Sequence, residues 1–220
     1  MHKNNLCVYC LKYAQSVLGE NLVFDGGKTD KSIPISFVVY LIKANGKNIL
    51  IDAGCDTMPK FDMKRFYSPA FVLRQVGLSA NDITDLVITH AHHDHIAAIP
   101  HFKNATVHIC EAEYNIGKKY IPSDMQLHIF KDNFNLTNQV KVVEWGGHSK
   151  GSSIVEIKTE DSIHILAGDE CYTNKNIKEK LCTGSFYNKE KSIAFVQKFS
   201  NCKYHVHTCH DISLKTERII

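Results

Sequence analysis

The segment THAHHDH, residues 89–95, holds four histidines and one aspartate within seven positions. Core packing does not require such a density of polar side chains, whereas imidazole and carboxylate groups are common ligands of divalent zinc, manganese or iron. Because the side chains of an extended strand alternate in direction, His90 and His92 point to the same side and can share one ion. A turn at the end of the strand would carry Asp94 and His95 toward a neighbouring ion. This one segment can therefore serve two metal ions.

Three further donors follow at the ends of expected strands: His148 in WGGHSKGS, Asp169 in ILAGDE and His210 in TCHD. Glycines precede the first two of these, as close backbone approach at a ligand-bearing turn requires. In a chain with 13 histidines, an isolated His148 or His210 would more often be an ordinary surface or core residue. The preceding HxHxDH motif favours the ligand interpretation. Five imidazoles and two carboxylates form a ligand set for two ions with open positions, not a closed structural site.

The elements that must position these donors are mostly short strands. Asn45-Gly46 joins the first two strands as a hairpin turn, and the first helix is predicted by Ser68 as N-cap, Pro69 as first residue and Gly77 as terminator. Strands are expected at residues 36–43, 47–54, 85–90, 106–110, 126–130, 139–145, 152–159, 162–169 and 203–209, and helices at 69–77, 111–119 and 189–200. Two runs of strands, each followed by helices, predict an α+β fold. We expect an αββα sandwich of two mixed sheets with outer helices, forming a single domain over residues 1–220.

The composition excludes several classes of partner. The chain has 220 residues, 44% of them hydrophobic, and a formal net charge of +3 without a basic stripe, so nucleic acid is not an expected partner. Its longest candidate membrane run, residues 37–42, is far shorter than the roughly 20 apolar residues that span a bilayer. The N-terminus has no apolar stretch leading to a small-residue cleavage site. We therefore expect a cytoplasmic protein that does not enter a membrane.

Eight cysteines are scattered along the chain, a pattern that favours reduced thiols over a disulfide framework. Cys7 and Cys10 have the spacing of a redox or zinc pair, but an extended stretch would turn them to opposite sides. We favour two small buried hydrophobic residues. Cys55 and Cys209 lie near Asp52 and His210 in the sequence, and packing is again the favoured role, with oxidation or metal capture as the alternative.

The order HxHxDH, a GHSxGS-type turn, GD and a C-terminal histidine resembles the metallo-β-lactamase superfamily over residues 35–211. The spacing agrees as well as the motifs, since His148 follows His95 by 53 positions, Asp169 follows by 21 and His210 by a further 41. The resemblance implies two metal positions that share Asp169 as a bridging ligand: His90, His92 and His148 would hold one ion, and Asp94, His95 and His210 the other. It also implies that Asp52, in an Asp-x-Gly turn, orients a ligand imidazole.

Two such ions lower the pKa of a bridging water toward about 7 and polarise a carbonyl or phosphoryl group. The expected activity is hydrolysis by a metal-bridging hydroxide, with zinc as the first expectation and manganese or iron as alternatives. The segment GDECYTNKN, residues 168–176, resembles N-acyl homoserine lactonases, in which a tyrosine follows the bridging aspartate by three positions. The resemblance implies that Tyr172 hydrogen-bonds the carbonyl or oxyanion, and that Asp94 passes a proton to the leaving alkoxide. A small-molecule ester or lactone is the expected substrate.

Other interpretations stay open. The same ions would serve a phosphodiester or thioester hydrolase, and a non-catalytic metal-binding or sensing protein would keep the ligands while closing the pocket. The loop between Gly54 and Ser68 is shorter than in well-known lactonases, which leaves substrate choice open and allows either a monomer or a homodimer. Packing is favoured for the apolar side chains of this loop, against a wall above the metals: Met58, Phe61, Met63, Phe66 and Tyr67. His93 is expected to line the pocket or face solvent.

Overall fold

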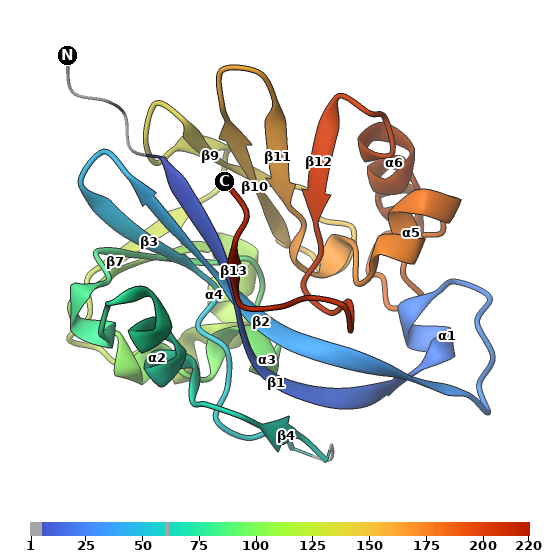
Figure 1. The fold of residues 1–220 in the computed structure, drawn as a ribbon, viewed down its shortest axis with the longest axis horizontal. Helices are drawn as coiled ribbons and strands as arrows, with labels where there is room; N and C mark the ends of the chain where they lie inside the picture. Colours follow the sequence, from blue (N-terminus) through green and yellow to red (C-terminus); the bar gives the residue numbers. More distant parts are fainter. Residues whose placement is uncertain (1–5, 60–61) are drawn as a thin grey trace.

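The computed structural model describes residues 6–59 and 62–220, which form two β-sheets flanked by helices (Figure 1). The larger sheet has eight strands in the order β13-β1-β2-β3-β5-β6-β7, with β4 paired to β1. Its pairs are antiparallel from β13 to β3 and parallel from β3 to β7. The strands are β1 Cys7–Gly19, β2 Ser32–Ala44, β3 Lys47–Ile51, β4 Lys64–Arg65, β5 Asp85–Ile88, β6 Thr106–Cys110, β7 Leu127–Phe130 and β13 Glu217–Arg218.

The smaller sheet has five strands in the order β12-β11-β10-β9-β8. The β11–β12 pair is parallel and the others are antiparallel, so both sheets are mixed, as predicted. Its strands are β8 Phe134–Asn135, β9 Val140–Glu144, β10 Ser153–Lys158, β11 Ile163–Leu166 and β12 Tyr204–His207.

Helices cover the outer faces of both sheets, which confirms the αββα layering (Figure 1). The helices are α1 Glu20–Val23, α2 Pro69–Val72, α3 His93–Ile96, α4 Glu111–Gly117, α5 Asn174–Glu179 and α6 Lys189–Phe199. One core packs α2 and α3 against the larger sheet, and another packs α6 against the smaller sheet. A third core lies between the sheets. None of the described helices has the length and apolar character needed to cross a membrane.

Strand β2 shows why the central strands are apolar without alternation. Phe37, Val39 and Leu41 pack under the helices, whereas Val38 and Tyr40 face the second sheet. Side chains of a strand alternate between its two faces, so a strand buried on both needs apolar residues throughout.

Some segments differ from their predicted form. The helix expected at 69–77 begins at Pro69 with the Ser68 cap and ends at Gly77, but its second half is a 3₁₀ turn. The strand expected at 203–209 stops at His207, because the chain then turns to form the ligand loop. Segment 126–130 pairs with β6 and therefore belongs to the larger sheet, not to the second run of strands.

The ligand-bearing segments all follow the C-terminal ends of strands. Strands β3 and β5 lead into Asp52 and into residues 89–95, while β9, β11 and β12 lead into His148, Asp169 and His210. Strands β3 and β5 run parallel in one sheet, and β9 runs in the same direction as β11 and β12 in the other. The topology therefore gathers five distant segments at one end of the sandwich.

Candidate metal centre

The structure brings all seven predicted ligands together, and four of them form a first cluster: His90, His92, His148 and Asp169. The Nδ1 atom of His92 lies 3.0 Å from His90 Nε2 and 2.9 Å from His148 Nε2. A single imidazole nitrogen offers one hydrogen or one lone pair in the plane of the ring, so His92 Nδ1 cannot form good hydrogen bonds with both neighbours. The three nitrogens instead surround a common point, as ligands of one ion would. Asp169 Oδ2 completes the cluster at 3.5 Å from His90 Nε2 and 3.3 Å from His148 Nε2.

A second cluster lies on the other oxygen of Asp169. Its Oδ1 atom is 3.0 Å from His95 Nε2 and 3.2 Å from His210 Nε2. Asp94 Oδ2 lies 3.6 Å from each of these two nitrogens. Ligand atoms of a tetrahedral ion bound at about 2.0–2.1 Å are separated by about 3.3 Å. The spacing in both clusters fits one ion each, with Asp169 shared between them.

Three ligand histidines are oriented by groups that only accept hydrogen bonds. His95 Nδ1 donates to Asp52 Oδ2 at 2.7 Å, and His210 Nδ1 donates to the carbonyl oxygen of Ser36 at 2.8 Å. His148 Nδ1 donates to the carbonyl oxygen of Ser185 at 2.7 Å. The ring proton must therefore sit on Nδ1, which leaves the Nε2 lone pair free toward Asp169. This is the tautomer that metal ligation requires.

Asp52 is held in a demanding backbone conformation for this purpose. Its φ of 61° is left-handed, a region that aspartate tolerates better than most residues. The carboxylate also accepts hydrogen bonds from the backbone N–H and the hydroxyl of Thr89, at 2.7 and 2.9 Å. These contacts confirm that Asp52 orients a histidine of the cluster, and that this histidine is His95.

The charges of the centre also fit cations. Asp52, Asp94 and Asp169 bring three carboxylates to a largely buried site. Burial lowers the pKa of His95, but the three carboxylates outweigh it and hold the pKa well above its usual range, so that without an ion the ring takes up a second proton on Nε2, where a metal ion would otherwise bind. The Nε2 atom of His95 is buried and has no hydrogen-bond partner. Buried charges need compensation, and divalent ions would satisfy both the carboxylates and this orphaned nitrogen.

Cys209 lies closer to the centre than its expected packing role suggests. Its Sγ atom is 3.1 Å from Asp169 Oδ1 and 3.1 Å from the carbonyl oxygen of Gly168. Burial, followed by the charge of Asp169, raises the pKa of the thiol well above its usual value. Without an ion, Cys209 is a thiol within hydrogen-bond distance of both oxygens, and its sulfur lies close enough to His95, Asp169 and His210 to be a possible metal ligand with them. All eight cysteines are free thiols; Cys10 is buried as predicted, whereas Cys7, which was also expected to be buried, is only partly buried.

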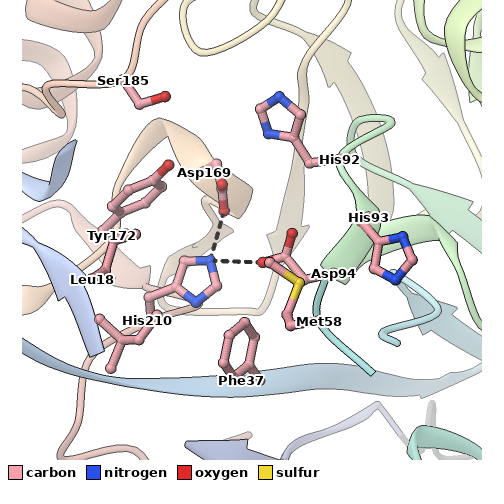
Figure 2. A pocket seen from close by; sticks show the side chains of 11 residues that line it. Leu18, Phe37, Met58, His92, His93, Asp94, Asp169, Tyr172, Ser185 and His210 are labelled. Atoms are coloured by element: carbon pink, nitrogen blue, oxygen red, sulfur yellow. Dashed lines mark ion pairs between the residues drawn. The ribbon is translucent and has the colours of Figure 1, made fainter. Parts of the chain in front are cut away.

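A cavity of about 250 Å³ opens beside both clusters (Figure 2). Asp94, Asp169, His92 and His210 line it, and the predicted Tyr172 lies in the same wall. Four apolar side chains line the same cavity: Leu18, Ile35, Phe37 and Met58. Met58 thus lines the pocket and also packs against the core of the larger sheet, as expected, and Phe61 lies outside the described residues.

His93 lines the cavity through a ring whose nitrogens are both occupied. Its Nε2 lies 2.8 Å from the carbonyl oxygen of Thr57, and its Nδ1 lies 3.2 Å from the Tyr120 hydroxyl. Sequence reasoning missed Ser185, which lines the cavity and carries the carbonyl that orients His148. No motif marks Ser185, because its backbone carbonyl makes this contact and any residue type supplies one.

Comparisons with known proteins agree with this geometry. The chain is 26% identical over 148 residues to the probable metallo-hydrolase MJ0296 of Methanocaldococcus jannaschii, covering 67% of this chain and 66% of that one. It is 26% identical over 123 residues to an N-acyl homoserine lactonase of Bacillus cereus, covering 52% and 49% of the two chains. The matches thus span about half to two thirds of these relatives.

The fold is similar to that of a crystal structure of a quorum-quenching N-acyl homoserine lactone lactonase, with a TM-score of 0.83, 21% identity and full coverage of both chains. At this identity the likeness concerns the fold. The family model described as the metallo-beta-lactamase superfamily matches residues 38–206, which include six of the seven predicted ligands. The chain therefore belongs to the metallo-beta-lactamase superfamily.

Proposed function

We propose that this protein is a two-metal hydrolase that opens a lactone or ester. The observation that carries the proposal is the shared cavity, which is lined by ligands from both clusters, by Tyr172 and by apolar side chains (Figure 2). His90, His92 and His148 would hold one ion, Asp94, His95 and His210 the other, and Asp169 both. When bound, the two ions supply an activated water at neutral pH and a Lewis acid for the substrate carbonyl. The nitrogen and oxygen donors favour zinc, with manganese or iron as alternatives.

In this proposal Tyr172 hydrogen-bonds the carbonyl oxygen of the substrate. Its ring packs edge-on against His210 with centroids 5.1 Å apart, which fixes it beside the centre. Burial, followed by the charges of Asp169 and Asp94, raises the pKa of the phenol well above 10. The phenol therefore keeps its proton and acts as a donor. Such a preorganised donor stabilises the negative charge that develops on the carbonyl oxygen.

In this proposal Asp94 carries the proton that the leaving group needs. Its carboxylate lines the cavity and reaches the second cluster, so it can hold a proton beside the departing alkoxide. Opening an ester or lactone breaks the bond between the acyl carbon and this oxygen, and the oxygen then needs a proton. Asp94 would accept a proton from the attacking water and then pass it to this oxygen, so that the proton lost by the nucleophile is the one the leaving group gains.

The walls of the cavity favour a neutral substrate. Phe37, Met58, Leu18 and Ile35 offer an apolar surface for an acyl chain, and none of the described lining residues is a lysine or arginine. A phosphodiester carries a negative charge that would find no cationic side chain among them. An uncharged lactone or ester with an apolar substituent matches both features.

The test is a hydrolysis screen of purified, zinc-loaded and manganese-loaded protein. The panel contains lactones with acyl chains of different length, an open-chain ester, an acyl thioester and bis(p-nitrophenyl) phosphate. We expect turnover of lactones or esters that is lost on chelation and restored by the metal. Protein that holds two ions but hydrolyses only the phosphodiester or the thioester would refute the lactone proposal, and silence on every probe would favour a metal-binding or sensing role.

A further inference from the structure

Glu113 is a buried carboxylate of helix α4 that lies outside the ligand set. Only 1% of its surface is exposed, and both of its oxygens are used. Oε2 accepts the backbone N–H of Ala91 at 2.8 Å. Oε1 accepts the hydroxyl of Ser149 at 2.7 Å and the backbone N–H of Gly151 at 2.8 Å. One carboxylate therefore connects two separate loops.

These two loops carry the three histidines of the first cluster. Ala91 lies between His90 and His92, and Ser149 directly follows His148. Within the described residues, the other two histidines have different supports: the Asp52 carboxylate holds His95, and the Ser36 carbonyl holds His210. The Glu113 contacts thus join the two loops that supply all three histidines of the first position, whereas the second position takes only Asp94 and His95 from one of these loops.

The hydrogen-bond pattern requires a carboxylate at this position. Backbone N–H groups can only donate, and one of them faces each oxygen of Glu113. A glutamine would have to place its NH₂ group against either Ala91 N–H or Gly151 N–H. Either orientation leaves one buried donor facing another donor, which the surrounding structure can relieve only by moving a loop.

We propose that Glu113 is a positioning residue for the first ion, acting by cross-linking the loop of His90 and His92 to the loop of His148. The inference rests on the proposed two-ion centre and adds a residue outside it. Groups that hold metal ligands in place typically change metal affinity by about 10- to 100-fold when they are replaced. The same loss is expected here at the first position, with the second position close to wild type.

The experiment compares Glu113→Gln with Glu111→Gln. Glu111 lies two residues away on the same helix, is exposed and pairs with Lys131 at 3.0 Å, so its substitution removes the same charge without touching either loop. Metal-free proteins are equilibrated against a series of buffered zinc concentrations, and bound zinc is counted by mass spectrometry. Imidazole ¹⁵N NMR identifies which histidines lose their ion. The unfolding temperature of each metal-free protein is recorded in parallel.

In Glu113→Gln we expect the His90, His92 and His148 signals to lose zinc at a concentration at least tenfold higher than in wild type, and Glu111→Gln to match wild type. Wild-type affinity in Glu113→Gln, or equal weakening of both positions, would overturn the proposal. If Glu113→Gln does not fold, Ser149→Ala replaces it in the experiment, because this variant removes only one of the hydrogen bonds to Glu113. Unchanged zinc binding at the first position in Ser149→Ala would then refute the proposal. A wild-type protein holding one ion at the first cluster would refute the two-ion function while leaving Glu113 testable there.

Discussion

A substitution of Asp52 should affect the second ion position, because the Asp52 carboxylate accepts the Nδ1 hydrogen of His95 and thereby fixes which ring nitrogen is free for the ion. In Asp52→Asn the backbone should be unchanged, since asparagine tolerates the left-handed φ of 61° as well as aspartate does. Oδ1 must still accept the Thr89 N–H, so the new NH₂ group takes the place of Oδ2 and faces His95 Nδ1. An NH₂ group donates, so Nδ1 must accept. The ring proton then moves to Nε2, the atom that should bind the ion.

The magnitude follows from this tautomer change. Replacing the hydrogen-bond partner of a metal-bound histidine costs about 10- to 100-fold in affinity, or about 1.4–2.7 kcal/mol. The larger loss should fall on the second position, because Asp52 bonds His95 directly, whereas it reaches the first cluster only through the Thr89 hydroxyl, which lies 3.1 Å from His90 Nδ1.

The assay is zinc binding by chelator competition, with Asp124→Asn at an exposed position as the control for charge. We expect Asp52→Asn to lose at least tenfold in zinc affinity at the second cluster and much less at the first cluster. This selectivity is the opposite of that expected for Glu113→Gln. Two ions bound with wild-type affinity would show that the tautomer of His95 is not what Asp52 controls.

Other predictions concern catalysis, the second buried glutamate and pH. Tyr172→Phe should lower kcat on lactones by about 100- to 1,000-fold with metal content unchanged, measured by kinetics and mass spectrometry, and an unchanged kcat would show that the phenol does not take part. Asp94→Asn should nearly abolish turnover while metal content falls only in part; full activity would exclude its proton role. Glu170 uses only Oε1, which accepts two backbone N–H groups at the His148 loop and the Ser152 hydroxyl. A glutamine oxygen can accept the same hydrogen bonds, so Glu170→Gln should bind zinc as the wild type does. Glu170→Ala loses these bonds and should bind zinc at the first cluster about tenfold more weakly. Equal zinc binding by the two variants would contradict this prediction. Burial, followed by the neighbouring histidines, lowers the pKa of His207 to about 4. The unfolded chain therefore binds this proton first as pH falls from about 6.5 to 4, which removes about 3 kcal/mol from the free energy of unfolding of metal-free protein. Urea titrations of His207→Gln should lack this part of the acid loss, and an identical pH dependence would refute it.

The ligands of the centre could be predicted because they are encoded locally. Residues 89–95 carry their donors within one strand end and one turn. Asp169 directly follows Gly168, which has a φ of 51°, and His148 follows a pair of glycines of which Gly146 has a φ of 75°. The layering was also predictable, because strands such as β2 are apolar on both faces and those of the smaller sheet end at polar turns.

The supporting residues could not be predicted, because their roles depend on tertiary contacts. Glu113 has the same sequence surroundings as the exposed Glu111, and only the approach of the loop after His148 distinguishes them. Strand β13 is two residues long and exists through its pairing with β1. Cys209 gained its contact with Asp169 from the turn after β12, which was expected to remain extended.

The central claim is that two ions share Asp169, and counting bound ions tests it most directly. Metal-free protein is equilibrated with zinc, freed of unbound metal and analysed by mass spectrometry together with Asp169→Asn. We predict two zinc ions per wild-type chain and a loss of affinity at both positions in the variant, because each oxygen of Asp169 faces one cluster. A wild-type chain that retains at most one ion, or a variant that still binds two as tightly, would contradict the account.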